Sequence, residues 1–181
     1  MKKVYLIRHG LPAFPMGVKM CLGTTDIPLG EAGKLQAREM AEKLPPVTAV
    51  FSSPLRRAFQ TAQAIGMPIT VFSGLREMYA GEWDGLNFET IRQRYPDLYA
   101  ARASDLTLPL PGAEDQEAAL VRFRCDLAQA AQSAPGDFAV VAHGGVIAKF
   151  LEFTTGTWYK PDYCEIISLS FENGTFSLLE E

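Results

Sequence analysis

The sequence predicts an α/β fold, a three-layer sandwich in which a mostly parallel central sheet carries helices on both faces. Short apolar runs alternate with longer amphipathic stretches along the 181 residues, as in folds whose strands are joined by helical crossovers. Near the C-terminus, Asn173-Gly174 separates two strand-like runs, which predicts a two-residue hairpin. That hairpin is expected to add antiparallel strands at one edge of the sheet.

The N-terminal part of the chain is expected to form a strand, a long loop and a helix. Val4 to Ile7 is apolar and is predicted to be a buried strand. Leu11 to Leu29 is rich in proline and glycine, which indicates a loop, and a loop of this length is usually functional. Gly30 to Leu44 then has a helical period and ends before Pro45-Pro46. Its apolar or small positions are Ala32, Leu35, Met40, Ala41 and Leu44.

The next elements are expected to be a strand, a helix and a further strand. The second strand is predicted at Val47 to Phe51. Ser53 is the expected N-cap of the following helix, with Pro54 at its first position, and the helix runs to about Ile65. A third strand, Ile69 to Phe72, leads into a loop.

Two short helices and one long helix are expected after the third strand. The short ones are predicted at Phe88 to Tyr95 and Asp97 to Arg102, and Leu106 to Gly112 is a connector with two prolines. Asp115 to about Gln132 is the longest helical stretch. Its buried side is expected to consist of Ala118, Val121, Leu127, Ala130 and Ala131.

The C-terminal part is expected to hold a strand, a helix and the hairpin. Phe138 to Ala142 is an apolar run that predicts the fourth strand, and a helix is predicted at Val146 to about Phe153. Glu165 to Phe171 and Thr175 to Leu179 are the expected hairpin strands. Because no repeat, low-complexity tract or linker interrupts the chain, residues 1–181 are expected to form a single domain.

Composition and charge argue against several classes of function. The formal net charge is −4, whereas a nucleic-acid-binding protein needs a basic face. No run approaches the ~20 apolar residues of a membrane span, and the run after Lys2-Lys3 is too short for a signal peptide. The three cysteines are widely spaced and form neither a disulfide framework nor a zinc pattern. A cytoplasmic protein without nucleic-acid or membrane partners is therefore expected.

The only two histidines follow two of the predicted strands. His9 ends the first apolar run and His143 ends the fourth, and each is followed by glycine. A single histidine is more often structural than catalytic. In open α/β sheets, however, ligands bind beyond the carboxyl ends of the strands, where both histidines would lie if the two strands are parallel neighbours. The pair therefore marks a candidate active site.

The sequence around these histidines resembles the histidine phosphatase superfamily, the phosphoglycerate mutase-like enzymes. The resemblance rests on Arg8-His9-Gly10, an arginine block from Ser52 to Ala62, an acid block from Leu75 to Gly85, and the run from Ala142 to Gly145, all in the family's order. It implies the same sandwich architecture. It also implies a small cap over the active site, formed by the long loop and the segment from Glu77 to Pro111.

The resemblance implies a role for each residue, and the residue types suit those roles. A neutral His9 would attack phosphorus and form a phosphohistidine. Arg8 and Arg57 would hold the phosphate oxygens, since a planar guanidinium matches phosphate, and their charges would disfavour protonation of His9. His143 would donate a hydrogen bond to the phosphoryl group. Arg56 is the alternative to Arg57, which the register of the block favours.

Glu77 is expected to be the general acid and base. It would protonate the leaving alkoxide and then accept a proton from the attacking water. It matches the family's acid by its position in a Leu-Arg-Glu pattern. Glu82 and Asp84 in the same loop are the alternatives, and solvated loop charge is the simpler interpretation of both.

Further substrate contacts are expected beside the catalytic residues. The amides of Gly144 and Gly145, at the start of a helix, can donate to an anion. Thr24 or Thr25 is expected to supply a hydroxyl from the long loop. Trp83 is expected to form an apolar wall against the leaving group, with simple packing as the alternative.

The sequence lacks the patterns of other phosphate chemistries. It has no Gly-x-x-x-x-Gly-Lys loop for nucleotides, no Asp-x-Asp pair and no histidine cluster for a two-metal site. The expected reaction is therefore independent of metals and cofactors. Its expected substrate is a small phosphorylated metabolite, and the protein is expected to be a monomer or a homodimer.

The family pattern also narrows the branch. The compact chain resembles phosphatases more than mutases, which carry larger caps, and Gly23 to Leu29 and Gly81 to Gly85 are similar to α-ribazole phosphatases of cobalamin biosynthesis. The long loop departs from the usual pattern at Leu11, Pro12 and Pro15, where relatives often have polar residues. A phosphoglycerate-type mutase and a non-catalytic protein that binds a phosphate ligand stay open as alternatives.

Overall fold

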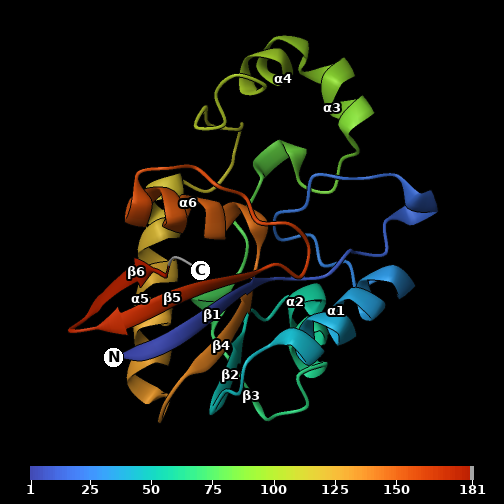
Figure 1. Ribbon diagram of the computed structural model, residues 1–181. Helices are drawn as coiled ribbons and strands as arrows, with labels where there is room; N and C mark the ends of the chain where they lie inside the picture. The colour runs from blue at the N-terminus through green and yellow to red at the C-terminus, as the bar shows by residue number, and fades with distance from the viewer. Residues whose placement is uncertain (180–181) are drawn as a thin grey trace.

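The computed structural model describes residues 1–179 and contains a six-stranded mixed sheet with helices on both sides (Figure 1). The strand order is β3-β2-β4-β1-β5-β6. The strands are β1 (Lys2–Arg8), β2 (Ala49–Ser52), β3 (Ile69–Val71), β4 (Phe138–Ala142), β5 (Ile166–Glu172) and β6 (Thr175–Leu178). The first four strands in this order are parallel, and β5 and β6 form the antiparallel hairpin. The predicted fold class is confirmed, and the last two residues of the predicted domain lie outside the described part.

The two faces of the sheet carry separate apolar cores because successive side chains of a strand point to opposite sides. On one face Leu6 and Val140 pack against α5 (Gln116–Ser133) and α6 (Gly144–Thr155). On the other face Ile7 and Val141 pack against α1 (Glu31–Lys43) and α2 (Arg56–Gln63). Strand β4 is buried along its whole length, as its continuous apolar run predicts.

The register of the central strands brings the two histidines together. Strand β1 pairs with β4 in parallel, and Arg8 lies opposite Ala142. The next residues along the two strands are His9 and His143, and the amide of His9 donates to the carbonyl of Ala142. Both histidines therefore lie at the carboxyl edge of the sheet, as the sequence predicts.

A small cap covers this edge of the sheet (Figure 1). It contains α3 (Phe88–Arg94), α4 (Pro96–Arg102) and a short 3-10 turn, Gly81–Trp83. The long loop is tied to the cap, since the amide of Cys21 donates to the Leu86 carbonyl. The expected cap is thus present, and it forms the roof of the site described below.

The start of α2 differs from the prediction. The helix begins at Arg56 rather than at Pro54, and its N-cap residue, Leu55, makes no side-chain cap. The hydroxyl of Ser53 still accepts from the amide of Leu55, as an N-cap would, and it also contacts the ring of His143. The helix begins later because Leu55 has an extended backbone, with φ −68° and ψ 134°.

The predicted buried sides of two helices are partly wrong. In α1 the expected Ala32 and Leu35 are exposed, and the buried residues are Gly33, Ala37 and Met40. These three also follow the helical period, and Gly33 must face inward because the backbone of Leu11 passes directly against it.

The same error occurs in α5, where Ala118 and Val121 are exposed. The buried side includes Leu120, Phe123 and Leu127, so the larger apolar residues set the orientation of this helix. Helix α6 begins at Gly144, two residues before the predicted start. None of the helices within residues 1–179 is long and apolar enough to span a membrane.

Candidate active site

His9 is buried at the end of β1, and its hydrogen bonds define its tautomer. Its Nδ1 lies 2.7 Å from the carbonyl oxygen of Gly10, which can only accept, so Nδ1 carries the proton. Its Nε2 lies 3.3 Å from Nε of Arg57, which can only donate, so Nε2 holds a lone pair. The ring is therefore neutral, and Nε2 is its nucleophilic atom.

The surroundings of both histidines favour the neutral ring. Burial lowers the pKa of His9 well below its ordinary value, and the positive charges of Arg57, Arg8 and Lys160 lower it further, although the hydrogen bond to Gly10 opposes them. Burial likewise lowers the pKa of His143, with Arg57 as the next cause. A neutral imidazole is the form that can attack phosphorus.

Arg57 is held against His9 by the long loop. Its Nη1 and Nη2 donate to the carbonyls of Thr25 and Gly23, at 2.9 and 2.8 Å. The side chain is 1% exposed, so the loop fixes the guanidinium with little freedom. Arg56, the alternative from the sequence, is exposed on the next position of α2.

Arg8 reaches the same site from the end of β1. Its Nη1 donates to the carbonyl of Pro161, and its guanidinium carbon lies 3.9 Å from the ring centroid of Tyr163. Its Nε is buried and has no hydrogen-bond partner among the described residues. A Cβ at position 144 would lie 2.9 Å from this Nε, so glycine allows Arg8 to take this position.

His143 offers a second unused donor. Its Nε2 lies 2.7 Å from the hydroxyl of Ser53, which has no other acceptor among residues 1–179, so Ser53 donates to Nε2 and the proton of the ring lies on Nδ1. Nδ1 is buried and unpartnered in the described part of the chain. The rings of His9 and His143 are 5.0 Å apart. An anion beside His9 Nε2 would satisfy Nδ1 of His143 and Nε of Arg8, since buried donors are rarely left unpaired.

Glu77 lies at the N-terminus of α6. Its carboxylate accepts hydrogen bonds from the amides of Gly145 and Val146, both at 2.8 Å. A Cβ at Gly145 would lie 2.8 Å from Oε1, so glycine allows this approach. The amide of Gly145 was expected to bind the substrate anion, but it donates to Glu77 instead. The helix dipole favours the negative carboxylate at this position.

The loop that carries Glu77 is fixed by Arg122 of α5. Its guanidinium donates to the carbonyls of Gly74, Arg76 and Glu77, and it forms an ion pair with Glu114 at 2.7 Å. The position of Glu77 is therefore set by a partly buried network and not by the acid block alone.

The other acids and contacts predicted from the sequence have different positions. Asp84 accepts from the amides of Gly23, Thr24 and Thr25 and from the hydroxyl of Thr24, so this hydroxyl is engaged within the loop. Burial raises the pKa of Asp84, but these hydrogen bonds outweigh it and keep the pKa below its ordinary value.

Glu82 and Trp83 lie in the cap. Glu82 is exposed and accepts from the hydroxyl of Tyr95. Trp83 is 4% exposed and packs near Tyr95 and Tyr99, and it lines neither of the two cavities described next. The expected substrate wall of Trp83 is therefore replaced by packing inside the cap.

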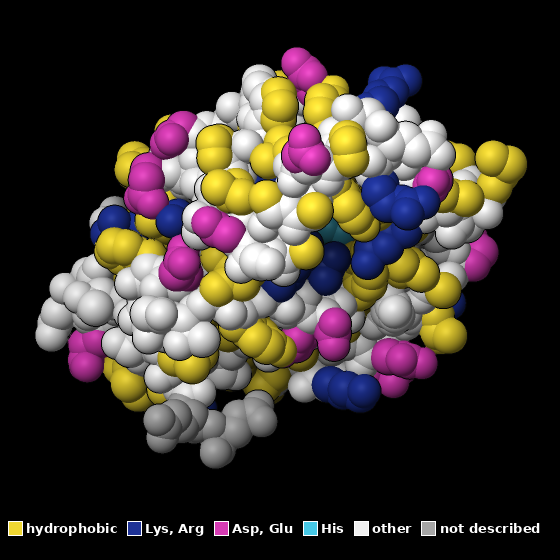
Figure 2. All heavy atoms as spheres, turned by 90° about the horizontal axis from the view of Figure 1, so that it is seen from above, with side chains coloured by type: hydrophobic (Ala, Val, Ile, Leu, Met, Phe, Trp, Pro, Cys, Tyr) yellow, Lys and Arg dark blue, Asp and Glu magenta, His cyan; other side chains and the backbone are white. Residues whose placement is uncertain are grey.

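Two adjoining cavities lie between the sheet edge and the cap. The smaller, about 300 Å³, is lined by Arg8, His9 and Gly144. The larger, about 580 Å³, lies beneath the cap. Leu22, Glu77 and Lys160 line both. In the view onto the cap, a histidine is visible in a hollow surrounded by lysine and arginine side chains (Figure 2). Glu77 thus stands between the cavity beside His9 and the larger pocket.

Four residues of the site were not identified from the sequence. Ser53 was interpreted as a helix cap, and Arg122 is one of several charges on a long helix. Lys160 and Tyr163 lie in the connection between α6 and β5, which has no motif. Within residues 1–179 no group of three or more histidine, cysteine or acidic side chains is arranged to hold a metal ion.

Comparison with known proteins places this geometry in context. Residues 4–180 match the family model of the histidine phosphatase superfamily, branch 1. A Bacillus subtilis protein described as an uncharacterized phosphatase is 33% identical over 164 residues, which cover 86% of this chain and 79% of that protein. A mycobacterial glucosyl-3-phosphoglycerate phosphatase, solved with VO3, has a TM-score of 0.82 and 29% identity over 94% of this chain and 93% of that one.

A more distant structure shares the fold alone. The α-ribazole phosphatase from Shigella flexneri has a TM-score of 0.80 and covers 98% of this chain and 94% of its own, at 22% identity. The similarity of its fold carries no information on the substrate of the present chain.

Proposed function

The chain belongs to the histidine phosphatase superfamily and is a phosphatase of that family, and we propose that it hydrolyses its substrate through a phosphohistidine on Nε2 of His9. The observation that carries the proposal is a neutral His9 ring in a site with two buried donors, Nε of Arg8 and Nδ1 of His143, that have no partner among the described residues. The ring of His143 lies 5.0 Å from that of His9. A nucleophile beside unfilled donors is the arrangement that transfer of an anionic phosphoryl group requires.

In the first step, the lone pair of His9 Nε2 attacks phosphorus and the bond from phosphorus to the leaving oxygen breaks. Glu77 is the general acid of this step: with the negative phosphate bound beside it, it takes up a proton and gives that proton to the leaving oxygen, so the product departs as an alcohol. Arg8, Arg57 and His143 hold the three remaining phosphoryl oxygens as their charge redistributes. The products of this step are an alcohol and phosphorylated His9.

In the second step, water attacks phosphorus and the bond to Nε2 breaks. The carboxylate of Glu77 accepts the proton of that water, which returns both the acid and the neutral imidazole to their starting states. His9 and Glu77 thus each act in both steps without changing position. This agrees with the fixed position of Glu77, which Gly145, Val146 and Arg122 hold between the two cavities.

The proposed substrate is a small phosphorylated metabolite, hydrolysed in the cytoplasm by a single domain without a metal. A cavity of about 580 Å³ is of the size that holds small-molecule ligands. The name α-ribazole phosphatase belongs to a structure that shares the fold only, so α-ribazole 5′-phosphate is one member of the test panel and not the proposed substrate.

The test is phosphate release from a panel of phosphomonoesters with a chelator present. The panel includes p-nitrophenyl phosphate, α-ribazole 5′-phosphate and 3-phosphoglycerate. We expect hydrolysis that survives chelation and is abolished in His9→Ala, with the unfolding temperature of the variant measured as a control of folding. Acid-quenched wild-type protein should carry phosphate on histidine. Activity retained by a folded His9→Ala protein would rule out the phosphohistidine route, and transfer of phosphate to a second hydroxyl would indicate a mutase.

A further inference from the structure

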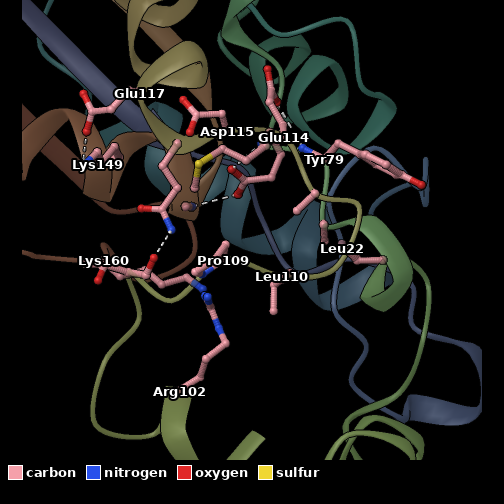
Figure 3. A pocket seen from close by; sticks show the side chains of 17 residues that line it. Leu22, Tyr79, Arg102, Pro109, Leu110, Glu114, Asp115, Glu117, Lys149 and Lys160 are labelled. Carbon is pink, nitrogen blue, oxygen red and sulfur yellow. Dashed lines mark hydrogen bonds and ion pairs between the residues drawn. The ribbon is translucent and has the colours of Figure 1, made fainter. Parts of the chain in front are cut away.

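The larger cavity is lined by a half-buried arginine that forms no ion pair with the residues the structure describes. Arg102, the last residue of α4, reaches into the cavity from the cap, toward Lys160 (Figure 3). Its Nη1 is buried and has no hydrogen-bond partner within the described residues. Burial lowers the pKa of Arg102, while Cys21 and Asp105 oppose the shift. A buried N–H group of a guanidinium is rarely left without a hydrogen bond, because the loss of its hydration must be compensated.

The aromatic contact of Arg102 does not account for this donor. The guanidinium carbon lies 5.9 Å from the ring centroid of Trp83. A cation over an aromatic ring interacts through its charge and leaves its N–H groups free. The contact with Trp83 therefore positions the guanidinium group but leaves Nη1 available.

The acidic residues that line the cavity already have partners. Glu114 pairs with Arg76 and Arg122, and Glu117 pairs with Lys149 at 2.8 Å. Asp115 accepts from the amide of Ala118 as the N-cap of α5. Figure 3 shows these acids on the side of α5, with Arg102 entering from the opposite side.

Lys160 is the second cation of this cavity without an ion pair among residues 1–179. It lines both cavities beside Glu77, whereas Arg102 lines only the larger one. A phosphoryl group at His9 would not neutralise all of this positive charge. The remaining positive charge extends from Lys160 to Arg102, along the cavity that the leaving group would occupy.

We propose that Arg102 binds a second anionic group, a carboxylate or a further phosphate, on the leaving group of the substrate. This inference rests on the proposed function, since the leaving group is defined by a phosphoryl group at His9 and by Glu77 at the scissile oxygen. Lys160 lies between the two anions. Leu22, Pro109 and Leu110 supply an apolar surface for the carbon skeleton that connects them. The substrate class is accordingly a small phosphomonoester with a second negative charge.

The test compares pairs of substrates that differ in that charge alone. In 3-phosphoglycerate the carboxylate replaces the terminal alcohol of glycerol 3-phosphate, and fructose 1,6-bisphosphate adds a phosphate to fructose 6-phosphate. We expect wild-type kcat/KM to favour the charged member of at least one pair by about 10- to 100-fold, as a hydrogen bond to a charged group provides. The pair that responds identifies the anion as carboxylate or phosphate.

The variants are Arg102→Gln, Arg102→Lys and the control Arg94→Gln. Arg94 is an exposed arginine of α3 that lines neither cavity, so its loss changes the charge of the cap equally. Arg102→Gln should remove most of the preference, chiefly through KM of the charged member. Arg102→Lys should retain part of it, because the charge stays but the planar donor pair is lost. Arg94→Gln should keep the wild-type ratio.

Equal kcat/KM within both pairs, or a preference unchanged in Arg102→Gln, would overturn the inference while the phosphatase activity stands. Absence of any His9-dependent hydrolysis, p-nitrophenyl phosphate included, would overturn the proposed function instead. The anion site is then decided by calorimetry with 3-phosphoglycerate and fructose 1,6-bisphosphate, in which binding of either must weaken about 10-fold or more in Arg102→Gln. Equal affinity of the wild type and this variant for both compounds would contradict it.

Discussion

The two ends of the active-site cavity are built from different parts of the fold. The phosphate end consists of Arg8, His9 and His143, which follow two adjacent parallel strands, and of Arg57, which is fixed by two carbonyls. The leaving-group end is lined by residues of the cap and its connections, such as Arg102. In the proposed mechanism the first end carries out the reaction of the family, and the second end selects which ester reacts. Variants at the two ends should therefore change activity in different ways.

The largest effect is expected at the boundary between the ends. Glu77→Gln removes the proton that the leaving oxygen needs, so kcat for alkyl phosphates should fall about 10²- to 10⁴-fold. For p-nitrophenyl phosphate, whose leaving group needs no proton, the first step should change little. The measurement is the pre-steady-state rate of leaving-group release across esters of graded leaving-group pKa, because the second step is common to all esters and also uses Glu77.

Glu82→Gln is the matched control for Glu77→Gln, because Glu82 is exposed and contacts Tyr95 outside both cavities. It should behave as the wild type. If Glu77→Gln slowed leaving-group release from all esters equally, or if Glu82→Gln reproduced its profile, the assignment of the acid would be wrong.

A smaller but uniform effect is expected at the phosphate end. Arg57→Ala removes a donor that contacts His9 and that holds the phosphoryl group in the proposed mechanism, so kcat/KM should fall about 10²- to 10³-fold for every ester tested. Arg56→Ala changes the neighbouring, exposed residue and should leave kcat/KM near the wild-type value. The two variants are compared over the charged and uncharged substrate pairs. If Arg57→Ala lowered kcat/KM only for the substrates with a second negative charge, the assignment of Arg57 to the phosphate end would be wrong.

The phosphate end was predictable from the sequence because local patterns determine it. A strand that leads into His-Gly has one carboxyl end, and parallel pairing of two such strands brings His9 and His143 together. The arginine and acid blocks carry Arg57 and Glu77 on motifs. The residues that support this end are not predictable in the same way. Ser53 is expected to cap a helix, yet it also contacts His143, and Gly33 faces inward because the backbone of Leu11 lies against it.

The leaving-group end was not predictable in the same way. Arg102 is one of several charges at the end of a short helix, and Lys160 lies in a connection without regular structure. Their importance follows from where the cap places them and from which acids are already paired. No local sequence pattern shows the positions of these two residues or the pairing of the acids, because both depend on contacts between segments far apart in the chain. Trp83, which lies in such a pattern, packs within the cap instead.

The smallest effect separates the two ends through their influence on stability. His9 and His143 are neutral in the fold because burial, aided by nearby arginines, lowers the pKa of each below its ordinary value of 6.5. Above that value both states bind no proton on these rings. Below it the unfolded chain takes up protons that the folded protein does not, so the free energy of unfolding falls as pH falls.

The expected slope is about 1.4 kcal/mol per pH unit for each histidine, between pH 6.5 and the lowered pKa of the fold. His9→Asn should lose the share of one histidine, because asparagine does not titrate. Arg102→Gln, at the leaving-group end, should keep the full wild-type slope. The measurement is denaturant unfolding of the three proteins at pH 7.5, 6.5 and 5.5. Identical slopes in wild type and His9→Asn would contradict the lowered pKa of His9, because the ring would then take up a proton at the same pH in the folded and unfolded states. The lone pair at Nε2 would in that case be free only above the ordinary pKa of histidine.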